Sequence, residues 1–124
     1  MATLTAKLTL SSSDIDPNNT LDLSLSSALT TADPSSMPSR VSVAHDAYTV
    51  LVAKDLSLQY YVYIKNIGSL NSRAIDVAED KDNNKIATLQ VGEFMFLPIQ
   101  SAAGIMVQST TSAEIVEYAY FAKG

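Results

Sequence analysis

The sequence predicts an all-β protein, a β-sandwich or jelly-roll-like single domain. Apolar and polar residues alternate in short segments, which is the pattern of strands with one buried face. Polar turn-forming clusters separate these segments roughly every eight to twelve residues, as in sandwiches. No segment of about ten or more residues has a convincing helical period. At 124 residues, the chain has the size of one domain.

The first predicted strand spans residues 2–10, where polar and apolar residues alternate. Residues 11–19 collect Ser, Asp, Pro and Asn and are expected to form a loop, because these side chains favour turns. Residues 20–26 resume the alternation and predict a second strand. Three leucines share one face of the first strand: Leu4, Leu8 and Leu10.

Residues 28–39 are rich in Ser, Thr and Pro, and we expect either a long surface loop or an arm. Pro34 and Pro38 should stop any regular element there, since proline lacks a backbone N–H. The sequence therefore divides into an N-terminal part, 1–43, with strands and a Pro/Ser-rich connector, and a sandwich core, 44–124. Together they form one domain, and the first two strands pair either with an edge of the core or with a neighbouring subunit.

The core is predicted to contain a series of short strands. The runs 40–44 and 48–53 flank His45-Asp46-Ala47, which suits a hairpin or a corner between sheets. The longest strand candidate is 57–67, and residues 79–85 form a charged turn. The region from Tyr60 to Phe121 is expected to run up and down continuously. Further strands are predicted at 74–78, 86–91, 93–99, 105–109 and 113–121.

The strand 93–99 carries the most concentrated apolar run in the sequence. Gly92 precedes it and suits a tight reversal, because glycine takes positive φ without a Cβ clash. Both faces are apolar, which predicts a strand buried between two layers. Pro98 cannot donate a ladder hydrogen bond, so the strand should end or bulge there. One face carries Phe94, Phe96 and Pro98, and the other face carries Met95, Leu97 and Ile99.

Composition argues against several classes of function. The net charge is −5 with only eight Lys and Arg residues, so no basic stripe is present for a nucleic-acid backbone. The chain has no Cys, which removes thiol nucleophiles and thiolate metal sites. No apolar run approaches the length of a membrane span, and the N-terminus lacks the apolar stretch of a signal peptide. We therefore expect neither a nucleic-acid nor a membrane partner.

The candidate catalytic and metal patterns are weak. His45 and Asp46 could belong to a Ser/His/Asp arrangement, but the sequence has no Gly-x-Ser-x-Gly motif, and adjacent strand residues point to opposite faces. Asp80, Asp82 and Asn84 begin like a calcium loop, yet Lys85 replaces the required Gly and Val91 the bidentate Glu. We predict no enzyme activity, no cofactor and no metal site, with a solvated turn at 79–85.

Tyrosines are concentrated in two of the predicted strands. Tyrosine is favoured at interfaces because its ring is apolar and its hydroxyl is hydrated, although cross-strand packing within one sheet also explains such a cluster. We therefore consider a candidate interface made of the leucines of the first strand and these tyrosines. Its residues are Leu4, Leu8, Leu10, Tyr61, Tyr63, Tyr118 and Tyr120.

Four segments, 1–16, 62–67, 92–98 and 116–121, resemble small virion structural proteins of tailed phages, especially marine ones. They are packing and turn motifs, and no set of functional residues transfers with them. The resemblance implies a β-sandwich that decorates or cements the capsid, often as a homotrimer, with an N-terminal segment on the major capsid protein. It also implies a place on the capsid surface of the virion, after assembly in the host cytoplasm.

Two alternatives to a capsid decoration protein remain open. One is a tail, neck or fibre component of the virion. The other is a carbohydrate-binding jelly roll for host attachment, in which tyrosine rings would stack on sugars and Asp80, Asp82 and Asn84 would hold calcium.

Overall fold

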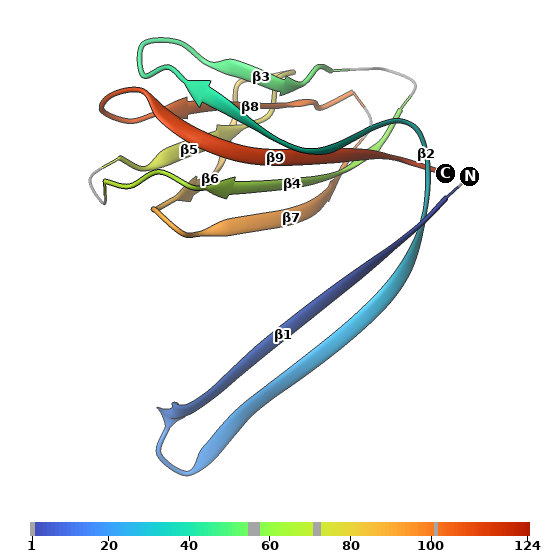
Figure 1. Ribbon diagram of the computed structural model, residues 1–124, viewed down its shortest axis with the longest axis vertical. Helices are drawn as coiled ribbons and strands as arrows, with labels where there is room; N and C mark the ends of the chain where they lie inside the picture. The colour runs from blue at the N-terminus through green and yellow to red at the C-terminus, as the bar shows by residue number, and fades with distance from the viewer. Residues whose placement is uncertain (1, 55–57, 71–72, 101) are drawn as a thin grey trace.

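A computed structural model describes residues 2–54, 58–70, 73–100 and 102–124. The protein is a sandwich of two antiparallel sheets (Figure 1), which confirms the all-β prediction. The larger sheet has the strand order β1-β2-β9-β4-β7, and the smaller has the order β3-β8-β5-β6. No helix long and apolar enough to cross a membrane occurs in these ranges. The strands are β1 (Ala2–Asp16), β2 (Asn19–Val43), β3 (Thr49–Val52), β4 (Tyr60–Asn66), β5 (Ile75–Ala78), β6 (Lys85–Leu89), β7 (Phe94–Ile99), β8 (Ile105–Ser109) and β9 (Glu114–Lys123).

The hydrophobic core lies between the two sheets. Alternate residues of β4 point inward, so Val62 and Ile64 are fully buried while their neighbours lie on the outer face. Ile75 of β5 and Ile105 of β8 pack against them from the smaller sheet. This burial places Tyr61, Tyr63 and Lys65 on the outside of the larger sheet.

The longest strand is β2, which continues through the stretch predicted as a loop or arm. Its register with β9 shifts between Ala32 and Ser35 and again between Ser36 and Ser39. Pro34 lies within the first shift and Pro38 within the second. The expectation that the prolines stop regular structure was wrong, because these bulges leave the prolines outside the ladder while pairing resumes on either side.

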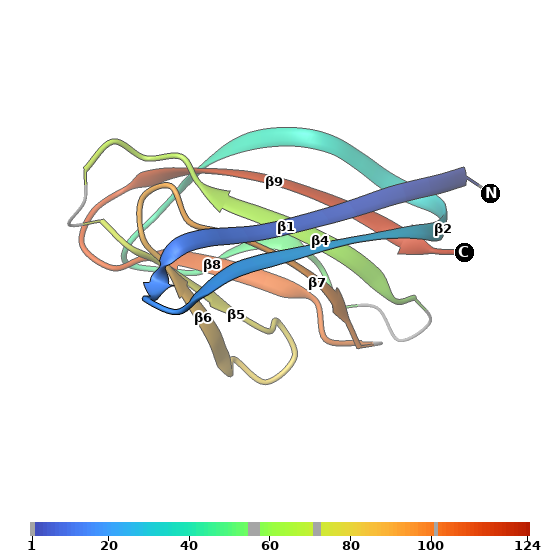
Figure 2. The same cartoon turned by 90° about the horizontal axis from the view of Figure 1, so that it is seen from below.

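A two-stranded arm projects from the sandwich (Figures 1 and 2). It consists of β1 and the first half of β2, paired from Ala2↔Thr31 to Asp16↔Asn19. The predicted loop at 11–19 shrinks to a tight turn, in which Asp16 accepts hydrogen bonds from the Asn18 backbone N–H (2.9 Å) and from Asn19 Nδ2 (3.1 Å). The arm ends where β2 begins to pair with β9, at Thr31.

The strand β7 lies at the edge of the larger sheet, paired only with β4. The prediction that it is buried between two layers was wrong, because its outer face has no layer over it: 59% of Phe94 and 40% of Phe96 are exposed. Pro98 lies inside the strand, where an edge tolerates its missing N–H. Gly92 has φ 87°, which confirms the predicted reversal.

The predicted up-and-down order of the core was also wrong. Among the described residues, only β5 and β6 pair as consecutive strands between β4 and β9, and β4 pairs instead with β7 and β9. Residues 44–48 form a corner between the sheets, as one of the two interpretations had it, since β2 and β3 lie in different sheets. The strand predicted at 57–67 is shorter, Tyr60–Asn66, and Ser57 lies outside the described residues.

Candidate functional site

The candidate site is an apolar groove of about 820 Å³ between the arm and the outer face of the larger sheet. Figure 2 shows the arm crossing over β9, β4 and β7. Two surfaces form its walls, and we call them the leucine face and the aromatic face. The leucine face carries Leu4, Leu8, Leu10, Leu21, Leu23, Leu25 and Leu29. The aromatic face carries Tyr61, Tyr63, Phe94, Phe96, Pro98 and Phe121.

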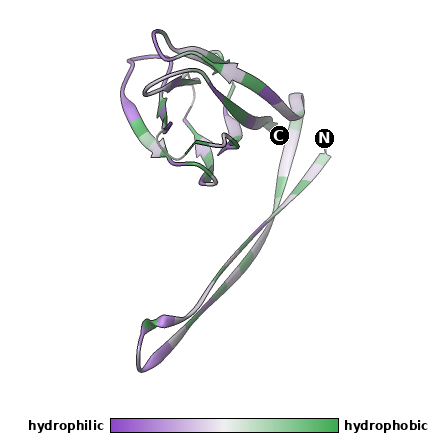
Figure 3. Cartoon of the chain, turned by 60° about the vertical axis from the view of Figure 1, so that its left-hand side comes forward, coloured by the Kyte–Doolittle hydropathy of each residue, from purple (hydrophilic) through white to green (hydrophobic). Residues whose placement is uncertain are grey.

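The leucine face is a ladder of paired side chains along one side of the arm. Leu4 lies opposite Leu29, and Leu10 lies opposite Leu23. Residues directly opposite each other in an antiparallel pair point to the same face, so the leucines form one continuous apolar strip. Figure 3 shows hydrophobic and hydrophilic segments alternating along the arm. Most of these leucines are exposed, and only Leu4 and Leu29 are half-buried.

The aromatic face consists of rings from three adjacent strands. Tyr61 of β4 stacks on Phe96 of β7, with ring centroids 6.1 Å apart and an interplanar angle of 10°. Phe121 of β9 lies opposite Tyr61 on its other side. The ammonium group of Lys123 lies 5.3 Å from the centroid of the Tyr61 ring, within the range of a cation–π contact. The rings are therefore held against one another by contacts within the chain.

Polar groups on the outer sheet face centre on Glu117. The Tyr63 hydroxyl donates to Glu117 Oε1 (2.8 Å), and Arg40 Nε lies 3.8 Å from Glu117 Oε2. Burial of the hydroxyl, followed by its hydrogen bond to the carboxylate and the carboxylate's charge, raises the pKa of Tyr63 to about 12. The Tyr63 hydroxyl is therefore satisfied within the chain, and the residue lines the groove.

The structure divides the predicted interface residues into two groups. Leu4, Leu8, Tyr61 and Tyr63 line the same groove, and Leu10 continues the leucine face toward the tip. Two other tyrosines of that set, Tyr118 and Tyr120, lie on the inner face of β9 and pack against the core. Tyr120 meets Tyr60 edge to face, with centroids 5.8 Å apart.

Sequence reasoning missed the contributions of β7 and of the second arm strand. Phe94 and Phe96 were expected inside the protein, because a strand that is apolar on both faces usually has a layer on each side. Leu25 and Leu29 could have been found, since their spacing matches the alternation of the first strand.

The residues of the two weak chemical patterns lie elsewhere. His45 lies in the corner between the sheets, where its backbone carbonyl accepts a hydrogen bond from Gln108 Nε2 (2.8 Å). Asp80 accepts one from the backbone N–H of Lys54 (3.1 Å), and Asn84 Nδ2 donates to Glu79 (3.0 Å). Within the described ranges, no three His, Cys, Asp or Glu side chains group together as metal ligands.

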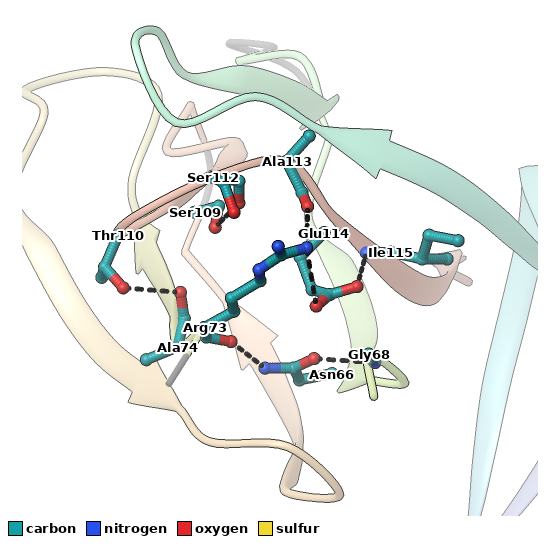
Figure 4. Close-up of polar contacts among 10 residues, drawn as sticks. All are labelled: Asn66, Gly68, Arg73, Ala74, Ser109, Thr110, Ser112, Ala113, Glu114 and Ile115. Atoms are coloured by element: carbon teal, nitrogen blue, oxygen red, sulfur yellow. Dashed lines mark hydrogen bonds and ion pairs between the residues drawn. The ribbon is translucent and has the colours of Figure 1, made fainter. Parts of the chain in front are cut away.

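A buried polar cluster joins the loops at one end of the sandwich (Figure 4). Asn66 donates through Nδ2 to the carbonyls of Arg73 (3.1 Å) and Leu89 (3.0 Å), and its Oδ1 accepts from the Gly68 N–H (3.0 Å). The carboxylate of Glu114 accepts from the Ile115 N–H (3.0 Å) and lies 4.0 Å from Arg73. These groups satisfy backbone atoms of the loops, so the cluster has a structural role.

Comparison with known proteins assigns the chain to no family. The sequence matches no protein-family model and has no significant similarity to a curated protein.

Proposed function

We propose that this protein is a non-enzymatic structural component of a phage virion, a capsid decoration or cement protein that binds the surface of the major capsid protein and stabilises the shell. The observation that carries this proposal is the groove, in which the leucine face of the arm stands opposite the aromatic face of the sandwich. A projecting apolar arm on a rigid β domain suits binding to another macromolecule, and the resemblance of the sequence to small phage virion proteins supports the same role.

The size and chemistry of the groove favour a polypeptide partner. Exposed apolar side chains gathered in one place are a feature of many interaction sites in proteins. Leucines are the commonest residues of the arm wall and aromatic residues the commonest of the sandwich wall, and aromatic residues are enriched at the cores of protein interfaces. A segment of the major capsid protein that entered the groove would be covered on both sides.

Many copies on one shell would strengthen such a contact. Each additional copy held on a shared surface binds at a raised effective concentration, so weak individual contacts become strong together. Self-association, with the homotrimer that the resemblance implies, would add to this effect. In this role the protein would assemble in the host cytoplasm and remain on the capsid surface.

A carbohydrate-binding role in host attachment is the second candidate. The exposed ring of Phe94 and the stacked pair Tyr61 and Phe96 resemble the aromatic platforms on which sugars stack. A glycan array probed with and without chelator tests this alternative, because Asp80, Asp82 and Asn84 would then hold calcium. Chelator-sensitive binding to a glycan would move this function ahead of capsid decoration.

Immunogold labelling of intact virions tests the proposed function. Antibodies against this chain are applied to purified particles of the phage that encodes it, and gold is counted on heads and tails by electron microscopy. We expect gold on the heads. Gold confined to tails, necks or fibres would identify a different virion component, and unlabelled particles would contradict a virion role.

A further inference from the structure

The free edge of β1 is the longest unpaired strand edge in the described part of the chain. β1 is the outermost strand of the larger sheet and pairs with β2 alone. It runs for 15 residues. Between Ala2 and Ser13 it contains no proline and a single charge, Lys7. Strand edges of this kind pair readily with other strands, and natural proteins usually cover or block them.

The other edge of the same sheet is blocked. The Asn66 N–H donates to the Glu93 carbonyl (3.0 Å), which fixes the phase of the β4–β7 ladder. Hydrogen-bonded and non-hydrogen-bonded pairs alternate along an antiparallel ladder, so the pair Tyr61 and Pro98 is not hydrogen-bonded. The backbone nitrogen of Pro98 therefore points away from β4 and toward the free edge. A strand added to β7 would find no donor there, whereas β1 carries no such block.

The hydrogen-bonding pattern between β1 and β2 identifies the residues of β1 whose backbone N–H and C=O groups point toward the free edge. The Gly124 N–H donates to the Thr30 carbonyl (2.9 Å), so the polar backbone groups of Thr30 face β9 and those of Thr31 face β1. Thr31 lies opposite Ala2, so the even-numbered residues of β1 bond to β2. The odd-numbered residues, from Thr3 to Thr9, therefore direct their N–H and C=O groups outward.

We infer that two copies of this chain join by antiparallel pairing of their β1 strands about a two-fold axis at Ala6. In this register Ala6 lies opposite Ala6 of the second copy, Leu4 opposite Leu8, and Thr5 opposite Lys7. Every apolar residue from Ala2 to Leu10 then faces an apolar one. The four outward-facing residues of each strand would exchange about eight backbone hydrogen bonds, two for each pair.

Charge and apolar pairing favour the register centred on Ala6 over those centred on Lys7 and Leu8. Centring the axis on Lys7 would place the two ammonium groups directly opposite each other, and like charges in that position are destabilising. Centring it on Leu8 would place Leu4 opposite Ser12 and Ala2 opposite Asp14, which removes two apolar pairs. Pairing at Ala6 keeps the acidic tip, with Asp14 and Asp16, outside the ladder.

The pairing would unite the leucine faces of two arms. Residues directly opposite in a ladder share a face, so the four-stranded sheet would carry one leucine surface, with both sandwiches above it. This inference rests on the geometry of the arm and not on the virion role. It can therefore fail while head labelling of virions still supports the proposed function.

Cysteine cross-linking of the full chain tests the register. The chain contains no Cys, so any disulfide in a single-Cys variant joins two copies. Ala6→Cys would place two thiols in a pair that is not hydrogen-bonded, where the side chains lie closest and a disulfide fits. We expect Ala6→Cys to form covalent dimers at least about tenfold faster under mild oxidation than Thr9→Cys, whose partner is Thr3.

A second variant tests the edge itself. Thr5→Pro removes an outward N–H and leaves the ladder to β2 intact, because Thr5 does not bond to β2 in this phase. Combined with Ala6→Cys, it should abolish the rapid cross-linking. Equal cross-linking rates for Ala6→Cys and Thr9→Cys would overturn the pairing of two β1 strands. The edge would then bind a different protein or remain unpaired. Fastest cross-linking at Leu8→Cys would overturn the register.

Discussion

Leu8 of β1 lies directly opposite Leu25 of β2, and 37% and 49% of these side chains remain exposed. Side chains in this position gain less from the folding of their own chain than core side chains do, because the sandwich core does not cover them. Under the proposed function, a partner covers the leucine face and accounts for their apolar character. The leucine face should therefore matter much more for binding than for stability.

Replacing both residues, Leu8→Thr with Leu25→Thr, should lower the free energy of unfolding by about 1 kcal/mol or less, because it removes one half-covered cross-strand pair outside the core. By contrast, Ile64→Ala in the fully buried core should cost about 2–5 kcal/mol. Urea unfolding followed by circular dichroism measures both. A loss comparable to that of Ile64→Ala in the double variant would mean that the arm packs on its own sandwich in solution.

Asn66→Ala should destabilise the protein by about 3–5 kcal/mol, because it removes three hydrogen bonds of a fully buried side chain and leaves backbone groups of Gly68, Arg73 and Leu89 unpaired. Urea unfolding measures this loss as well. Gln90→Ala, at an exposed position just after β6, is the control and should lie within about 0.5 kcal/mol of the wild type. Equal stability of the two variants would refute the structural role of the cluster.

Tyr63 should titrate later than an ordinary tyrosine, since its pKa in the folded protein is raised to about 12. The raised pKa means that the folded state holds the phenolic proton more tightly than the unfolded state. Its contribution to stability is complete below pH 10 and is lost as the pH rises toward 12.

The difference between the ultraviolet titration curves of the wild type and Tyr63→Phe isolates this group. We expect a midpoint near 12, and Tyr63→Phe should lose less stability than the wild type between pH 10 and 12. A midpoint near 10 would show that the hydrogen bond to Glu117 does not persist in solution.

Gly68→Ala should destabilise the protein by about 1–3 kcal/mol, because a Cβ at this position would lie 2.5 Å from Glu114 Cγ and displace that buried side chain. The cost should fall in a Glu114→Ala background, where the obstructing atoms are absent. A double-mutant cycle measures the coupling, which should exceed about 0.5 kcal/mol. Additive effects would mean that the two residues do not compete for space.

The sequence was informative wherever local alternation decides structure. The strand starting at Ala2, the shared face of Tyr61 and Tyr63, and the reversal at Gly92 follow from period-two patterns and from the conformational freedom of glycine.

Strand partners could not be predicted in the same way, because pairing depends on contacts between distant segments. The bulges that accommodate Pro34 and Pro38, and the edge position of Phe94 and Phe96, arise only once β2 meets β9 and β7 meets β4. The candidate site was therefore predicted in part. The leucines of its first strand and its two tyrosines were anticipated, while the leucines of its second strand were missed and its phenylalanines became visible through the topology.

The binding of the chain to shells of the major capsid protein tests the central claim most directly. Co-sedimentation compares the wild type with two charge-matched arm variants. Leu8→Asp with Leu25→Asp alters the leucine face, and Thr9→Asp with Ser24→Asp alters a directly paired position on the opposite face. We predict that the leucine-face variant binds at least about tenfold more weakly than the wild type, a loss of ~1.4 kcal/mol or more in binding free energy. The opposite-face variant should bind like the wild type. Equal binding of the two variants would contradict the account.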